Sequence, residues 1–432
     1  MKLVKFALTP PIVAISVALF AATSFGGMKY STTLTVGGYT GEETLEGFPL
    51  LVRVPATVAE KCQADGRDIV FTSADGATTF AHEIDEWDAS GESLVWVRIP
   101  ALTKGMAFTM KFGNDAATES SENAAAVWSD YTAVWHLNET EGAGTTDFAA
   151  YDSTANGLTL NAIAGDKKTD GDIVNMQPVA GKIGGTARHL GNSITWGGGN
   201  ALVCDNTETF DALGDTFAVS CWMYQKSPVY DQHMAFGRKD GTRTNNDGWL
   251  IGYNGGYYQC GKTYSTKAKK ITSNYDGAWQ YVTFVYSGVT ATQYKDGLAF
   301  QAVAMSDAAT TTTYKFAIGA NENGSGGYRF NGGFDEFRIR GTVPSDARVA
   351  AEYANMTVED YVAFGPIEEI SSGDTLVVVG ENGDYGTVSP AYGKTAVTNG
   401  GVVGDFLNQY ATQLFHPALA IVIYLVLILI TS

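Results

Sequence analysis

Several residue types that identify common protein classes are scarce in this chain of 432 residues. Charged residues make up 17% of it, and there are only 4 cysteines and 11 prolines. No CxxC pair, HExxH motif or G-x-S-x-G elbow occurs, so the usual sequence signals of zinc sites, metalloproteases and serine hydrolases are missing. Basic residues are also few, because 28 Lys and Arg stand against 46 Asp and Glu and leave a formal charge of −18. Such an acidic surface repels phosphate backbones and argues against nucleic acid as a partner.

What the chain does contain is typical of β-sheet proteins. Its 50 Gly, 22 Tyr and 21 Phe favour strands joined by tight turns. The length predicts two or three domains.

The pattern of residues 28–126 predicts a first β domain. Gly66 and Gly76 each follow an Asp and mark turns, because glycine tolerates a positive φ. The small and polar residues 116–126 are expected to form a connector. The predicted strands are residues 48–54 (FPLLVRV), 68–71 (DIVF) and 94–99 (LVWVRI), which are short apolar runs bounded by turn signals.

Residues 127–366 predict a second, larger β domain. Apolar residues alternate through residues 216–223 (TFAVSCWM), which indicates a half-buried strand. Residues 279–286 (WQYVTFVY) are apolar on both faces and predict a central strand. Ser345 is expected to cap one short helix over residues 346–353 (DARVAAEY).

Five motifs follow one another in the first part of the chain: residues 65–71 (DGRDIVF), 82–88 (HEIDEWD), 95–97 (VWV), 112–114 (FGN) and 134–137 (VWHL). In this order they resemble domain of unknown function 2341, a family of exported bacterial proteins, over residues 38–135. The resemblance implies export rather than a particular chemistry.

The second part carries another ordered set of motifs: residues 135–139 (WHLNE), 152–154 (DST), 217–222 (FAVSCW), 248–249 (GW), 293–297 (QYKDG) and 330–339 (FNGGFDEFRI). Together they resemble a laminin-G-like jelly-roll of the concanavalin A-like type. We therefore expect an all-β protein, with an N-terminal β-sandwich-like domain followed by a larger jelly-roll sandwich. The resemblance implies binding of carbohydrate, glycoprotein or calcium.

The N-terminus has the features of a secretory signal. Lys2 and Lys5 precede an apolar stretch, and small residues follow it, which predicts a signal peptide over residues 1–26. A retained membrane anchor is the alternative. We expect an exported protein of the cell envelope or the extracellular space.

The C-terminal part ends in an apolar run. Residues 367–404 are expected to form an incomplete β unit or linker, and residues 405–432 a hydrophobic tail. A helix over residues 415–432 has a length of about 27 Å, close to the thickness of a bilayer core. It predicts a membrane-spanning tail. No Lys or Arg follows it, which leaves open a truncated or misread gene end.

Four cysteines in an exported chain permit disulfides. Cys62 stands alone in the first domain. At most one pair is therefore expected among Cys204, Cys221 and Cys260, and the sequence does not settle which.

Three tyrosines are candidates for a sugar-binding surface. Tyr253, Tyr257 and Tyr258 alternate with Gly and Asn, and aromatic faces stack on sugar rings, although ordinary packing explains them equally well. Residues 256–263 (GYYQCGKT) also spell a phosphate-binding loop. No helical period follows them, so we expect a hairpin there and not a nucleotide site.

Residues 83–88 (EIDEWD) nearly spell the carboxylate set of some glycosidases on concanavalin-like sandwiches. Glu83 and Asp85 share one face by alternation, whereas Asp88 lies on the other, so the pair of carboxylates that hydrolysis needs is incomplete. We expect solvated acids at an exposed strand edge instead.

Asp335 alternates with Phe337 and Ile339 along the predicted strand. We therefore expect its carboxylate to point inward with these apolar side chains. If the first and last strands of the jelly-roll are neighbours, Asp152 and Asn156 come near it. These three residues then offer the hard oxygen ligands that Ca²⁺ prefers. A turn-capping Asp is the alternative.

The sequence thus predicts a binding or adhesion protein that recognises a polysaccharide or glycoprotein, holds no cofactor except calcium, and is not an enzyme. Two alternatives remain open. One is a glycoside hydrolase-like enzyme on the same sandwich, and the other is a structural or sensor ectodomain without a ligand.

Overall fold

The computed structural model describes most of the chain between residues 27 and 398. The described segments are residues 27–141, 148–163, 178–185, 187–190, 201–225, 232–238, 248–254, 257–261, 269–271, 277–304, 312–322, 330–370, 376–379, 385–391 and 394–398. The predicted signal peptide and hydrophobic tail lie outside them. Within these segments, no helix is both long and apolar enough to cross a membrane.

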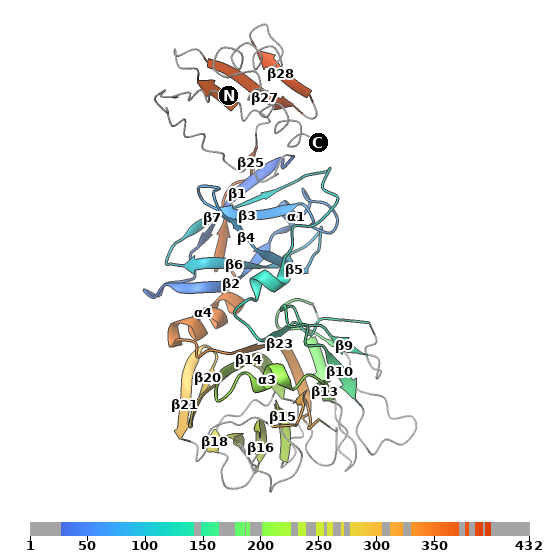
Figure 1. Cartoon of the computed structure of the whole chain (residues 1–432), viewed down its shortest axis with the longest axis vertical. Coiled ribbons are helices and arrows are strands. Elements are labelled where there is room, and N and C mark those ends of the chain that lie inside the picture. The colour runs from blue at the N-terminus through green and yellow to red at the C-terminus, as the bar shows by residue number, and fades with distance from the viewer. Residues whose placement is uncertain are drawn as a thin grey trace, which may run out of the picture.

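The first domain is a sandwich of two antiparallel sheets, as predicted (Figure 1). Its larger sheet contains β1 (Tyr30–Val36), β3 (Ile69–Ser73), β4 (Thr79–Phe80), β7 (Ala107–Phe112), β24 (Val362–Phe364) and β25 (Glu368–Glu369). Its smaller sheet contains β2 (Leu45–Val54), β5 (His82–Glu86) and β6 (Ser93–Leu102). Helix α1 (Ala56–Ala59) follows β2. The strand order of the larger sheet is β24-β1-β7-β3-β4, and β25 also pairs with β1. Two strands from beyond the jelly-roll, β24 and β25, therefore complete the first domain.

Strands β2 and β6 are buried on both faces. Leu50 and Val97 belong to the core of the first domain. Leu51 and Trp96 point the other way and belong to a separate apolar cluster with Trp222. Successive side chains of a strand point to opposite faces, so the second face of this small sheet is covered by the second domain.

The second domain is the predicted jelly-roll, built from two eight-stranded sheets. One contains β9 (Ala149–Ala150), β10 (Leu160–Ile163), β13 (Ala201–Cys204), β15 (Gln232–Arg238), β16 (Trp249–Asn254), β17 (Tyr257–Gly261), β18 (Lys269–Ile271) and β22 (Phe316–Ile318). The other contains β8 (Ala133–Trp135), β11 (Pro178–Val179), β12 (Ala187–Leu190), β14 (Thr216–Gln225), β19 (Trp279–Ser287), β20 (Thr290–Lys295), β21 (Leu298–Ala304) and β23 (Gly332–Arg340). Two short helices, α2 (Ala124–Val127) and α3 (Glu208–Asp211), lie in the connections.

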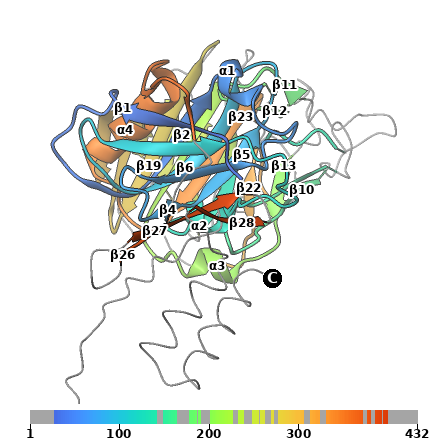
Figure 2. The same cartoon turned by 90° about the horizontal axis from the view of Figure 1, so that it is seen from above.

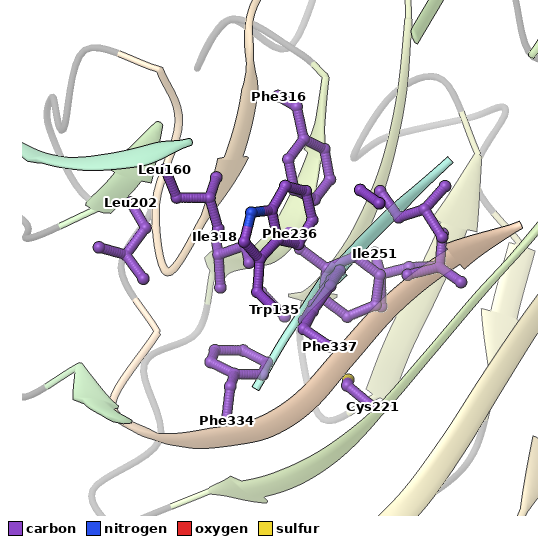
Figure 3. Close-up of a cluster of buried hydrophobic side chains, with 14 of the residues drawn as sticks. Trp135, Leu160, Leu202, Cys221, Phe236, Ile251, Phe316, Ile318, Phe334 and Phe337 are labelled. Atoms are coloured by element: carbon purple, nitrogen blue, oxygen red, sulfur yellow. The ribbon is translucent and has the colours of Figure 1, made fainter. Parts of the chain in front are cut away.

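The first and last strands of the jelly-roll are neighbours, as expected. Phe337 of β23 pairs with Trp135 of β8. Between the sheets, Trp135 stacks on Phe316 at 5.7 Å, and Phe236 meets Phe337 edge-on at 5.0 Å (Figure 3). Such aromatic pairs stabilise a core beyond the area that they bury.

The two sandwiches are stacked with one helix between them (Figure 1). This helix, α4 (Asp346–Thr357), confirms the predicted one, and Ser345 caps it by accepting a hydrogen bond from the Arg348 N–H. Seen from above, β2 and β6 lie across the jelly-roll sheet that contains β19 and β23 (Figure 2). The chain then returns to the first domain through β24 and β25.

A further sheet, outside the two domains, follows the return. It contains β26 (Leu376–Val379), β27 (Tyr385–Ala391) and β28 (Lys394–Thr398), paired in that order. These three strands lie within residues 367–404, for which the sequence predicts an incomplete β unit or linker.

The described cysteines are not paired. Cys62, Cys204 and Cys221 are all free, and the last two are buried. No disulfide therefore joins Cys204 to Cys221, and the side chain of Cys260 lies outside the described residues.

Candidate functional site at the domain junction

Glu83 and Asp85 of β5 are not solvated, contrary to the expectation from the sequence, whereas Glu86 and Asp88 are exposed as expected. Glu83 is 9% exposed, and the side chain of Asp85 is 5% exposed. The pairing of β5 with β6 shifts between Ile84 and Glu86. This irregularity breaks the alternation, so that Trp87 packs with the core of its own domain while the two acids face the jelly-roll. β5 is an edge strand, but the second domain covers it.

His136 of the jelly-roll meets these acids. It follows β8 directly, and its Nε2 lies 3.3 Å from Glu83 Oε2. Its Nδ1 lies 2.8 Å from Glu336 Oε1 of β23 and 3.8 Å from Asp85 Oδ2. Four residues from three strand regions and two domains thus form one buried polar cluster.

A bulge in β23 brings Glu336 into the cluster. Its φ is 51°, an uncommon value for a residue other than glycine. The pairing of β23 with β14 shifts there. Asp335 lies opposite Trp222, which packs at the domain junction, whereas Phe337 belongs to the jelly-roll core. The parity argument that placed Asp335 and Phe337 on one face was therefore wrong.

Every acid in this cluster has further partners. Glu83 accepts hydrogen bonds from the Trp128 indole N–H and the Ser153 hydroxyl. Arg338 donates to Glu336 Oε2 at 2.6 Å. Its guanidinium also lies over the Trp96 ring, 4.3 Å from the ring centroid, an arrangement that suits a desolvated cation.

Asp85 is held in the same way. The Asn138 side-chain amide donates to its Oδ1 at 2.6 Å. The Trp96 indole donates to its Oδ2 at 3.2 Å. Polar groups this deeply buried need such partners.

The charges of the cluster influence one another strongly. Burial is the main cause that raises the pKa of Asp85 to about 7; His136 acts against it, while Glu336 and Glu83 act in the same direction as burial. Burial alone lowers the pKa of His136, but Asp85, Glu336 and Glu83 outweigh it and raise that pKa well above its ordinary value. The pKa of Glu336 is lowered, because His136 and Arg338 outweigh its burial.

A shallow groove is formed by segments of the jelly-roll. It has a volume of about 310 Å³. It is lined by Ser129, Asp130, Tyr131, Thr132, Asn156, Thr209, Ala212, Leu213, Gly341 and Thr342. Hydroxyl, amide and small apolar groups dominate, and Asp130 is its only acid. No member of the buried cluster lines it.

Comparisons with known families agree with this two-domain arrangement. Residues 65–156 match the domain of unknown function DUF2341. Residues 197–350 match the concanavalin A-like lectin/glucanases superfamily. The chain joins a DUF2341 segment to a concanavalin A-like segment. The DUF2341 match runs past the junction and includes His136, whereas Glu336 lies in the concanavalin A-like match.

Solved structures resemble the fold only distantly. One is domain 4 of AbnA, a GH43 extracellular arabinanase from Geobacillus stearothermophilus, in complex with arabinotriose. It is 19% identical with a TM-score of 0.38, and the match covers 52% of this chain and 98% of that one. Another is the binding domain of botulinum neurotoxin DC in complex with SialylT, at 13% identity and a TM-score of 0.35, covering 53% and 52%. The chain thus spans about half of that toxin domain. A search of curated proteins found no match.

The residues expected to bind calcium lie in different elements, since Asp152 and Asn156 follow β9 and Asp335 lies in β23. Asp152 Oδ1 accepts hydrogen bonds from the N–H groups of Val134 and Thr154, and its Oδ2 accepts from Leu158 N–H and the Thr154 hydroxyl. This is the geometry of a turn-stabilising carboxylate. Asn156 donates to the Thr132 carbonyl and lines the groove.

Asp335 is held by the loop between β11 and β12. Its Oδ2 accepts from the N–H groups of Lys182 and Ile183. Burial, then Glu336, raises its pKa well above the ordinary value. Calcium binding by Asp152, Asn156 and Asp335 stays a prediction, and the contacts of Asp152 favour turn capping.

The three tyrosines lie in the hairpin of β16 and β17. Tyr253 pairs with Tyr258, and Asn254 pairs with Tyr257; their side chains lie outside the described residues. The residues that spell a phosphate-binding loop include the strand β17, which pairs with β16 and β18. The predicted hairpin is therefore confirmed.

The sequence reasoning missed His136 and Glu336. Both lie within the motifs that carry the jelly-roll resemblance (WHLNE and FNGGFDEFRI). They are 200 positions apart, and no spacing rule relates them. One sequence signal could have found them: each is a polar residue next to an aromatic residue of the core, Trp135 or Phe337.

Proposed function

We propose that this protein is an exported binding protein that recognises carbohydrate, either a polysaccharide or the glycan of a glycoprotein, through its concanavalin A-like domain. The observation that carries the proposal is the groove between residues 129–132 and Thr342. Its volume of about 310 Å³ suits a small ligand or a short part of a long one.

The chemistry of the lining suits sugars. Thr132, Thr209 and Thr342 offer hydroxyls that both donate and accept hydrogen bonds, and Asn156 offers an amide. Leu213 adds an apolar patch for the C–H face of a ring. The matched superfamily includes lectins by its own description.

Binding is favoured over hydrolysis at this groove. Glycoside hydrolysis ordinarily requires two carboxylates that flank the scissile bond. Asp130 is the only acid among the lining residues, and its Oδ2 accepts a hydrogen bond from Arg98 at 3.0 Å. The acids Glu83 and Asp85 are engaged in the buried cluster instead.

The proposed location follows from the sequence. The charged start and apolar run of residues 1–26 support export, and the apolar residues 415–432 support a membrane-spanning tail. N-terminal sequencing of the mature protein, and carbonate washing of membranes that carry the full-length chain, test these two points. An intact Met1 contradicts the first, and release of the chain by the wash contradicts the second.

The binding proposal is tested with the full-length chain on a glycan array, followed by calorimetric titration of the best ligand. Asn156→Ala and Thr342→Ala are expected to weaken binding about tenfold each, the loss that one or two hydrogen bonds explain. Thr103→Ala, which removes an exposed hydroxyl from the first domain, is the matched control and should bind as the parent does.

Two outcomes contradict the proposal. If no glycan binds, the chain is a structural or sensor module. If Tyr257→Ala abolishes binding while both groove variants retain it, the ligand lies on the hairpin of β16 and β17 and not in the groove.

A further inference from the structure

The geometry points to a metal site at the domain junction: we propose that Asp85, His136 and Glu336 bind one divalent ion of the Zn²⁺ class, which ties the first domain to the jelly-roll. This site is separate from the proposed carbohydrate groove, and neither proposal depends on the other.

The three potential ligand atoms converge on one point. His136 Nδ1 lies 2.8 Å from Glu336 Oε1 and 3.8 Å from Asp85 Oδ2, and one potential ligand atom from each of the three residues lies within 4.8 Å of the other two. Ligands of a tetrahedral zinc ion with bonds of about 2.1 Å are about 3.4 Å apart. The two observed separations bracket that value, so a small movement of the side chains accommodates the ion.

The nature of the ligands decides the class of ion. One imidazole nitrogen and two carboxylate oxygens are typical ligands of Zn²⁺. Ca²⁺ instead takes six to eight oxygen ligands, and Mg²⁺ keeps most of its water. An imidazole at the centre of the group disfavours both.

The opposite ends of the three side chains are already occupied. His136 Nε2 faces Glu83 Oε2 at 3.3 Å, Glu336 Oε2 accepts from Arg338, and Asp85 Oδ1 accepts from Asn138. A carboxylate on the far nitrogen of a metal-binding histidine fixes the tautomer and makes the near nitrogen a better ligand. Asp85 Oδ2 also accepts a hydrogen bond from the Trp96 indole at 3.2 Å, whereas no described residue outside the trio donates to Glu336 Oε1.

The charges of the cluster are compatible with a divalent ion. Three carboxyl groups, those of Glu83, Asp85 and Glu336, lie beside one guanidinium, that of Arg338. A divalent ion beside a neutral imidazole balances three carboxylates together with Arg338. Because the ligands must be deprotonated to bind a metal, we expect binding to weaken as the pH falls.

A second observation is a carboxyl oxygen without a partner on the residue before Glu336. Asp335 is 1% exposed, and its Oδ1 has no hydrogen-bond partner among the described residues. A buried polar atom without a partner is costly, and a cation in the cluster lowers that cost.

The ion has a way in. The His136 side chain remains 9% exposed and that of Glu83 12% exposed, so the cluster is not sealed from solvent. Because Asp85 belongs to the first domain and the other two ligands to the jelly-roll, the complete site exists only when the domains are docked.

The experiment uses the full-length chain, stripped with chelator and titrated with Zn²⁺. We expect one ion per chain by elemental analysis, a rise in melting temperature, and a tetrahedral absorption spectrum with Co²⁺. Asp85→Asn and Glu336→Gln are expected to lose the bound ion. Glu83→Gln should weaken binding by about 10- to 100-fold, as is usual for a residue that orients a ligand.

The matched control is Glu352→Gln. Glu352 is another buried acid at the same junction, hydrogen-bonded to Tyr131 and Tyr281, and its replacement should leave the stoichiometry of Zn²⁺ unchanged. The proposal is overturned if the stripped parent protein binds no Zn²⁺, a result that does not depend on how any variant folds. It is also overturned if Asp85→Asn and Glu336→Gln, folded by circular dichroism, keep the ion.

Discussion

Asn355 of α4 completes the free edge of β2 by pairing with the backbone of Leu51. The Leu51 N–H donates to Asn355 Oδ1 at 2.7 Å, and Asn355 Nδ2 donates to the Leu51 carbonyl at 3.1 Å. β2 is an edge strand of its sheet, so these backbone groups have no strand partner there. The side-chain amide takes the place of a neighbouring strand and attaches the helix to the first domain.

Replacement of Asn355 by Ala should therefore be strongly destabilising. Two buried backbone groups lose their partners, and each such loss costs about 1–3 kcal/mol. We expect the free energy of unfolding to fall by about 2–4 kcal/mol, measured by urea denaturation. Glu359→Ala, on the exposed residues after the same helix, is the control. An Asn355→Ala variant as stable as this control contradicts the assigned role.

Two turn glycines of the first domain provide a matched pair. Gly66 has a φ of +71° and Gly76 a φ of +72°, so a side chain is strained equally at both. A Cβ at Gly66 comes within 2.5 Å of the Trp87 ring, whereas a Cβ at Gly76 meets nothing within 4 Å. Gly76→Ala should cost about 1–2 kcal/mol, and Gly66→Ala about 1–3 kcal/mol more because of overpacking. Urea midpoints of the two variants measure the difference, and equal losses contradict it.

Buried His82 makes stability depend on pH. Burial lowers its pKa from 6.5 to about 4. Because the folded pKa is below the unfolded one, the neutral form stabilises the folded state above pH 6.5, and this contribution is lost as the pH falls towards 4. The loss approaches about 3 kcal/mol.

The histidine can be isolated with His82→Phe, which does not titrate. The difference in unfolding free energy between the parent and this variant should change between pH 7 and pH 4.5 in favour of the variant. Denaturation curves at the two values measure it. If the difference in unfolding free energy between the parent and His82→Phe stays constant with pH, the prediction is contradicted and other groups cause the acid sensitivity.

The buried thiols should be unreactive in the folded protein. Burial, followed by Asp335, raises the pKa of Cys221 well above its ordinary value, and burial raises that of Cys204. The reactive form is the thiolate. Iodoacetamide at pH 8 should therefore label neither residue in the native chain and both in urea, as mass spectrometry of peptides shows. If either stays unlabelled in urea without reductant, it forms a disulfide, and the free thiols are contradicted.

The sequence by itself determined the parts of this protein that depend on neighbours along the chain. Alternation predicted the strand that became β14, Ser345 marked the start of α4, and Gly66 marked a turn. These features rest on φ preferences, local hydrogen bonds and a period of two residues, all of which act over a few positions. Two sets of ordered motifs were enough to indicate two β domains and their order.

The tertiary structure alone decided which polar residues meet. Alternation placed Glu83 and Asp85 on one face, but it could not show that the face is covered by another domain. Bulges at Asp85 and Glu336 then placed Trp87 and Asp335 on the faces opposite to those that simple alternation predicts. One extra residue in a strand moves every following side chain to the opposite face. His136 and Glu336 come together only because the first and last strands of the jelly-roll are neighbours. That contact depends on closing the whole sandwich, which no local pattern records.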